Sequence, residues 1–379
     1  MIRSRLGQLL SGVVGTFFLL MIIGRSVAHA GGTIKIDDSH SISIGVGLRT
    51  SFNMVEDAAP DGKSRSKDFT LNDARIYMSG QLHELITFEL NTETEQTGPT
   101  TATESIRILD AVVKFGFNDY FNVWVGRFLP PSDRSNLSGP FYLNSWDYPL
   151  VALGYPAIFA GRDDGAAIWG MVGKGFFKYQ FGAFQGEGAV PGGPNQKDDL
   201  LYAGRLTLNL WDPEPGYYNS STYYGAMNVL ALGLVGMTQK NAVGTAATPG
   251  DFTGWNVDFL AERNLGAIGV PTFEAAYYHY DNDGVATEGK GYLALVSYLL
   301  PMKVGAGAFQ GQFQPLVRYQ KFKNEGPVTG DHNRVDAELS YIINGHNARI
   351  SFDYFKDKDK SVTGAPDVDG FRLGLQFQL

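Results

Sequence analysis

The chain has 379 residues, 44% of them hydrophobic and 13% aromatic, and it contains no cysteine. This length allows a large folded unit, but the composition excludes a disulfide framework, a thiolate metal site and a CxxCH haem attachment. The formal net charge is -8, and it becomes -11 once the three arginines of residues 1–30, which include no acid, are removed. So acidic a chain is a poor general binder of nucleic acid.

Residues 1–30 predict a secretory signal. An apolar run at 6–23 follows two arginines, and AHA at 28–30 has the small-x-small form of a signal-peptidase site. Cleavage before Gly31 would leave a short N-terminal segment, 31–40. The alternative is a membrane-anchoring helix, since the run approaches the roughly 20 apolar residues that a helix needs to span a bilayer.

From residue 41 onward, apolar and polar residues alternate with a period of two in segments bounded by Gly, Asn, Asp or Pro. This period places alternate side chains on opposite faces of a strand. The sixteen segments with this pattern are 41–53, 69–80, 84–94, 105–117, 120–129, 163–173, 176–186, 201–211, 223–238, 254–264, 271–281, 290–300, 312–323, 333–343, 348–358 and 370–379.

The connections between these strands alternate in length. The long ones follow the odd-numbered strands, at 54–68, 95–104, 130–162, 187–200, 239–253, 282–289, 324–332 and 359–369. Most of the others are short, although 212–222 and 301–311 are longer. An even strand number with long loops at one end and short turns at the other is typical of an outer-membrane barrel with both termini in the periplasm.

The last strand, GFRLGLQFQL at 370–379, alternates strictly and ends without a polar tail. In lipid every backbone group must pair within the sheet, so a final strand that closes against the first needs no tail. The sequence therefore predicts an all-β fold, a 16-stranded antiparallel transmembrane β-barrel over 41–379, located in the outer membrane. The ending resembles the C-terminal signal of bacterial outer-membrane proteins, from which Leu379 departs because Phe is common there.

Three stretches carry a family resemblance: FTLNDARIYMSGQL (69–82), ILDAVVKFGFNDYFNVWVGRFLPP (108–131) and AGRDDG (160–165). They resemble the phosphate-selective porin O and P family, which implies a sixteen-stranded channel, often trimeric, that uses basic side chains to pass anions. WDPEPGYY (211–218) and VGRFLPPSDRSNLSGP (125–140) also resemble the porin half of fused cytochrome-porin iron oxidases. The haem motif of that group is missing here.

Charged side chains with polar or small neighbours two positions away are expected to face the lumen. The pore-lining candidates are Arg49, Arg75, Lys178, Arg205, Arg318, Arg334, Asp336, Glu338, Arg349 and Arg372. A ladder of cations can pass anions between weak sites. We expect a weak to moderate anion preference carried chiefly by Arg49, Arg205, Arg334 and Arg372. The alternative is that acids on the same strands pair with these arginines.

The loop 130–162 is too apolar to remain in water, and loops of this length are usually functional. Folded into the barrel, it would narrow the pore. Its candidate constriction residues are Asp133, Arg134, Tyr142, Trp146, Asp147 and Tyr148. The alternative is a surface lid that packs on other loops.

No catalytic residue, metal site or cofactor is predicted. The histidines after residue 30 are neither spaced for a metal nor beside a nucleophile. DNDG (281–284) and DVDG (367–370) resemble calcium-loop starts, but Tyr292 and Gln378 stand where the bidentate Glu should be, so both are expected to be turns. A Ser/His lipase or an acidic/His protease in the outer membrane remains a formal alternative.

The favoured hypothesis is a porin that lets small hydrophilic solutes or ions diffuse passively. Its expected partners are outer-membrane lipid and small anions, with a homotrimer implied by the resemblance. The second hypothesis is a barrel that sheathes a separate secreted cytochrome in an electron-transfer conduit. A porin that is reconstituted alone conducts ions, whereas a sheath binds its cytochrome partner and co-purifies with haem.

Overall fold

The computed structural model describes residues 31–379 except 38, 95–104, 153–160, 287 and 363–366. The signal predicted at 1–30 and the loop predicted at 95–104 lie outside the described residues. Across the described part of the chain, no helix is both long enough and apolar enough to cross a membrane.

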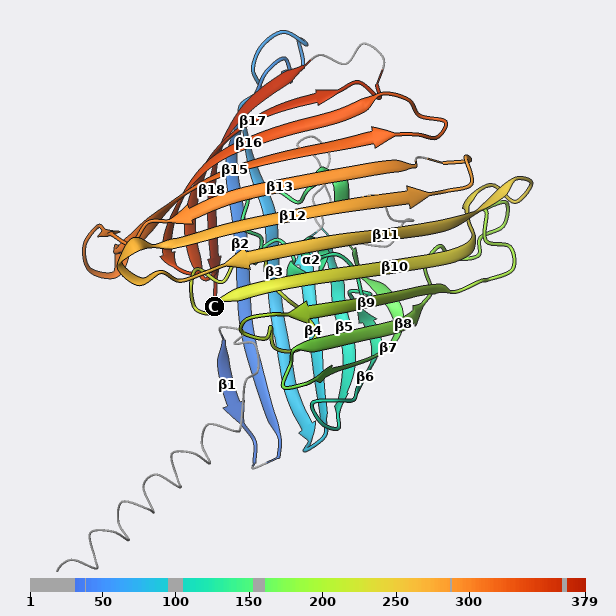
Figure 1. Cartoon of the computed structure of the whole chain (residues 1–379), viewed down its shortest axis with the longest axis horizontal. Coiled ribbons are helices and arrows are strands. Elements are labelled where there is room, and N and C mark those ends of the chain that lie inside the picture. The colour runs from blue at the N-terminus through green and yellow to red at the C-terminus, as the bar shows by residue number, and fades with distance from the viewer. Residues whose placement is uncertain (1–30, 38, 95–104, 153–160, 287, 363–366) are drawn as a thin grey trace, which may run out of the picture.

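Sixteen antiparallel strands close into a barrel, which confirms the predicted fold (Figure 1). The barrel closes where β18 pairs with β2, with Phe377 opposite Leu48. The strands are β2 (Ser41–Val55), β3 (Asp68–His83), β4 (Ile86–Thr94), β5 (Ile106–Gly116), β6 (Asn122–Phe128), β7 (Asp163–Val172), β8 (Phe177–Phe184), β9 (Leu201–Asn209), β10 (Val229–Gly244), β11 (Pro249–Glu262), β12 (Val270–Asp281), β13 (Gly289–Leu299), β15 (Gly311–Asn324), β16 (Asp331–Asn344), β17 (Ala348–Asp359) and β18 (Val368–Gln378).

Among the described residues, two short strands lie outside this ring of sixteen. β14 (Lys303–Val304) pairs with the start of β15. β1 (Gly32–Lys35) pairs with the first residues of β2, just beyond the point where β18 ends. The last residue, Leu379, still exchanges two backbone hydrogen bonds with Val46, of 3.0 and 2.8 Å. β1 therefore continues the line of β18 along the edge of β2.

The period-two alternation separates the two faces of the wall as the sequence predicts. On β16, Val335 and Leu339 are exposed on the outside, whereas Asp336 and Glu338 are buried on the inside. β18 repeats the division, with Leu373 outside and Gln376 inside. Apolar side chains can face lipid at low cost, while charged ones need the polar interior.

One connection was predicted at the wrong length. Residues 239–253 were expected to form a long loop, but β10 extends to Gly244 and β11 begins at Pro249, so only 245–248 connect them. The turn closes through backbone hydrogen bonds of 3.2 Å between Thr245 and Thr248. The polar residues around this turn belong to strand ends that extend beyond the apolar band of the barrel exterior. Their composition therefore resembles that of a loop.

Another connection is longer than predicted. A strand was expected at 223–238, but β10 begins only at Val229. Residues 210–228 therefore form a long connection at the end of the barrel that carries the short turns. The carboxylate of Glu262 accepts the backbone N–H groups of Tyr223 and Gly225 at distances between 2.8 and 3.1 Å. These amides are thereby satisfied without a strand partner.

Candidate functional site

Residues 129–152 of the connection between β6 and β7 lie inside the barrel, where they contain α2 (Arg134–Ser138) and a short 3-10 turn, η1 (Leu150–Ala152). Asp133 caps α2 by accepting the Asn136 amide at 3.0 Å. Inward polar side chains hold the loop backbone: Glu338 of β16 accepts the Trp146 amide at 2.9 Å. A loop held to the wall in this way narrows the lumen from the end that carries the long loops.

A second segment, residues 210–228, enters from the opposite end. Tyr217 is buried and donates from its hydroxyl to the Leu129 carbonyl at 3.1 Å. Its ring stacks on Trp124 of the wall, with centroids 4.5 Å apart. This inserted segment was not predicted. The available signal was a connection rich in tyrosine, too apolar for water, at the end where short turns were expected.

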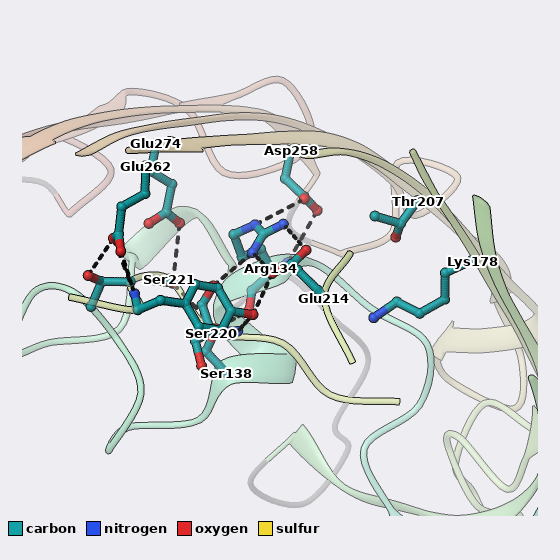
Figure 2. Close-up of polar contacts among 12 residues, drawn as sticks. Arg134, Ser138, Lys178, Thr207, Glu214, Ser220, Ser221, Asp258, Glu262 and Glu274 are labelled. Carbon is teal, nitrogen blue, oxygen red and sulfur yellow. Dashed lines mark hydrogen bonds and ion pairs between the residues drawn. The ribbon is translucent and has the colours of Figure 1, made fainter. Parts of the chain in front are cut away.

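The two segments meet at a buried ion pair, drawn in Figure 2. Arg134 donates to both carboxylate oxygens of Glu214, at 2.6 and 2.8 Å, and to the Ser220 carbonyl at 2.7 Å. Burial opposes ionisation of both groups, but Arg134 outweighs it and holds the pKa of Glu214 below its usual range. A bidentate pair of this kind fixes the relative position of the two segments.

Asp258 of β11 ties this ion pair to the wall. It accepts the Arg134 backbone amide at 3.2 Å, and it pairs with Arg205 of β9 through contacts of 2.5 and 2.8 Å. In Figure 2, Lys178 of β8 extends toward the same cluster, and it donates to the Gly216 carbonyl at 3.2 Å. Both basic candidates, Lys178 and Arg205, thus hold inserted segments.

The basic candidates on β15, β16 and β18 surround the loop at Asp147. Its carboxylate accepts from Arg334 at 2.7 Å and from Arg372 at 2.6 Å. Burial raises the pKa of Asp147, but these two arginines reverse the effect and hold it below the ordinary range. Arg318 donates to the Asp147 backbone carbonyl at 2.7 Å and to Asp336 at 2.9 Å.

The remaining basic candidates also face inward and also have partners. Arg49 pairs with Asp73 at 2.7 Å, and its guanidinium lies 4.2 Å from the Trp146 ring. Arg349 donates to two loop carbonyls, those of residues 143 and 144, at 3.0 and 3.1 Å. Arg75 pairs with Glu93. Arg49 and Arg75 are therefore paired with acids of the wall, as the alternative expects, whereas Arg349 holds the loop backbone.

Two tyrosine candidates lie in the buried part of the loop. The Tyr142 ring is 4.8 Å from that of His346, which belongs to the turn between β16 and β17. Burial raises the pKa of Tyr148 to about 12, so its hydroxyl stays protonated at neutral pH.

A cavity of about 270 Å³ remains between the two inserted segments and the wall of β3 to β5. Of the predicted residues, Arg75 and Tyr142 line it, and Arg162 joins them from the end of the loop. The predicted site residues did not include the other lining side chains used below, which are Glu89, Asn91, Asp110, Phe141, Tyr218, Asn219 and Tyr223.

A closed sixteen-stranded barrel with an apolar exterior and a charged, narrowed lumen is the architecture of an outer-membrane porin, and the outer membrane is where the chain is located. Residues 42–207 match the family model of the phosphate-selective porins O and P, which confirms the resemblance predicted from the sequence. Comparison with curated protein sequences gave no match.

Several solved structures share the fold at low sequence identity. An anion-selective porin from Comamonas acidovorans matches with a TM-score of 0.60 and 15% identity, over 90% of this chain and 100% of that one. OprB of Pseudomonas putida matches with a TM-score of 0.61 and 8% identity, over 91% and 95%. OmpT of Vibrio cholerae in a trimer form matches with a TM-score of 0.54 and 12% identity, over 90% and 100%.

Proposed function

We propose that this porin is a passive diffusion channel for small hydrophilic solutes and ions, with a weak anion preference. The observation that carries the proposal is the cavity beside β3 to β5, because the two inserted segments narrow the lumen there and leave a space with an aromatic and aliphatic side and a strip of charged and polar side chains. A lumen of this kind suits diffusion between weak sites.

The preference is weak because the inward arginines have partners. Arg49 and Arg205 are buried against Asp73 and Asp258. Arg334 and Arg372 keep more contact with the lumen, with side chains 15% and 13% exposed. The family name and the anion-selective Comamonas porin support an anionic sign. We assign the residual preference chiefly to Arg334 and Arg372, which share Asp147. Arg334 also pairs with Asp336 at 2.7 Å, and Arg372 lies 3.6 Å from Asp353.

The proposal includes no catalytic step, and the match to porins supports that choice. It also includes a homotrimer, supported by the trimer form of the Vibrio cholerae barrel. A sheath around a secreted cytochrome is not favoured, since the chain's own segments already occupy the lumen at Arg134 and Glu214.

Reconstitution into a planar bilayer tests the proposal. The purified protein should give stepwise ohmic currents in potassium chloride, and the reversal potential across a salt gradient should have the sign of a weak anion preference. Absence of current from correctly folded barrels would overturn the channel function. A cation-selective reversal potential would overturn only the selectivity.

A further inference from the structure

The lumen cavity has two chemically different sides. One side is aromatic and aliphatic and comes mainly from the inserted segments: Leu129, Leu137, Phe141, Tyr142, Pro215, Tyr218, Tyr223 and Met227. The other is a polar strip on β3 to β5, completed by two residues of the inserted segments: Arg75, Glu89, Asn91, Asp110, Arg162 and Asn219. A largely apolar pocket with a few convergent polar groups is the usual form of a small-molecule site.

The two sides meet at Phe141. Its ring centroid lies 5.3 Å from the Arg75 guanidinium and 6.3 Å from the centroid of the Tyr77 ring. An occupant with a ring and a charged group a few bonds apart could therefore contact the aromatic side and the polar strip together. The volume of about 270 Å³ is far above the roughly 10–15 Å³ that a cavity needs to hold one water, so there is room for one ring with a short polar chain.

The polar strip carries both signs of charge close together. Asn91 donates to Glu89 at 2.6 Å and to Asp110 at 2.9 Å, so the two carboxylates flank one amide. Arg162 lies 3.0 Å from Asp110, and Lys114 pairs with Glu89. A dianion such as free phosphate would lie beside these carboxylates and gain little, whereas an occupant with both signs can align with the strip.

The side-chain amide of Asn219 adds an orienting group. Neither its oxygen nor its nitrogen has a hydrogen-bond partner among the described residues, and the side chain lines the cavity from the segment 210–228. A buried amide without partners is costly unless an occupant satisfies it.

We propose that this cavity is a selectivity site for small aromatic zwitterions, of which free aromatic amino acids are the simplest. The ring packs against Phe141 and the tyrosines, the carboxylate faces Arg75 and Arg162, and the ammonium faces Glu89 and Asp110. The inference rests on the proposed channel function, because binding there would slow the passage of other ions. It differs from the phosphate specificity that the family name suggests.

The test is block of single-channel current by L-phenylalanine. We expect a saturable fall in potassium chloride current with L-phenylalanine, and none at equal concentration with L-alanine, which lacks the ring, or with phosphate, which lacks both the ring and the cation. Phe141→Leu should weaken the block about 2- to 10-fold, since one aromatic contact is lost. Phe273→Leu, on the outer face, is the matched control and should leave the block unchanged.

The outcomes separate this inference from the proposed function. A conducting channel that phosphate or L-alanine blocks as strongly as L-phenylalanine, or that none of them blocks, overturns the zwitterion site and leaves the porin function intact. If the protein does not conduct, saturation-transfer NMR on the solubilised barrel decides: signal from L-phenylalanine that falls in Asn219→Ala supports the site, and absence of signal overturns it. Asn219→Ala also replaces Phe141→Leu if that variant does not fold.

Discussion

Arg134 and Glu214 form a bidentate ion pair inside the barrel, although one belongs to a loop from one end and the other to a connection from the opposite end. Both side chains are almost fully buried. The pair therefore joins two segments that each close part of the lumen, and it does so where water cannot replace either partner.

The first prediction concerns this pair. Glu214→Gln keeps the shape but leaves Arg134 without its bidentate carboxylate, and removing one partner of a buried pair costs about 3–5 kcal/mol. We expect a lower unfolding temperature of the barrel in a heat-modifiability gel, and larger, noisier single-channel currents as the segment 210–228 loosens.

The matched control is Asp164→Asn, which breaks the exposed pair with Arg127. Exposed pairs contribute less than about 1 kcal/mol, so this variant should unfold like the natural protein. Equal unfolding temperatures for Glu214→Gln and the natural protein would show that the buried pair does not hold the two segments.

The second prediction concerns selectivity. Asp147→Asn removes the one carboxylate charge that Arg334 and Arg372 share, which leaves Asp336 and Asp353 as their other acidic partners. A unit charge about 8 Å from a permeating ion contributes roughly 0.5–1 kcal/mol at an effective dielectric constant of 40–80, so the chloride-to-potassium permeability ratio should rise about 2- to 5-fold. The measurement is the reversal potential across a potassium chloride gradient.

Asp61→Asn is the control for Asp147→Asn, because Asp61 lies in the exposed connection 56–67. Its charge should be screened from the pore at ordinary ionic strength. If both substitutions shift the reversal potential equally, or neither does, the assignment of the preference to Arg334 and Arg372 is wrong.

The third prediction concerns pH. His346 lies between the rings of Tyr142 and Tyr224 and near Arg349, and burial followed by the charge of Arg349 lowers its pKa from 6.5 to about 3. The unfolded chain thus binds a proton below about pH 6.5 that the folded protein does not bind until about pH 3. His346 therefore reduces stability as pH falls through this window, by up to about 1.4 kcal/mol per pH unit.

In the His346→Gln variant, the unfolding temperature should fall less than in the natural protein as the pH is lowered from 6.5 to 4. His83→Gln, at an exposed position, should retain the natural acid dependence. Identical acid profiles for His346→Gln and the natural protein would mean that His346 titrates normally.

The fourth prediction concerns topology. Tags inserted after Asp61 or after Gly192 should bind antibody on intact cells, because both positions lie in connections at the long-loop end, 56–67 and 185–200. A tag between Gly173 and Lys174, in a turn at the other end, should bind only after lysis. The reverse labelling pattern would show that the barrel has the opposite orientation in the membrane.

The sequence predicts the barrel well because a wall between lipid and a polar lumen imposes a period of two on the strands. It predicts the lumen poorly. Nothing local in WDPEPGYY indicates that Glu214 meets Arg134, 80 positions away in the chain. The cavity could not be predicted for the same reason. Its polar strip depends on the register of β4 and β5, where Asn91 opposes Asp110.

The most direct test determines which side of the lumen the ions pass through. The chain has no cysteine, so single thiols can be placed on either side of the lumen: Asn219→Cys at the cavity beside β3 to β5, and Ser297→Cys on β13, where Asn144 of the loop covers the position at 3.0 Å. A charged methanethiosulfonate reagent should reduce the single-channel current of Asn219→Cys and leave that of Ser297→Cys unchanged. A fall in current for Ser297→Cys, with none for Asn219→Cys, would contradict the account.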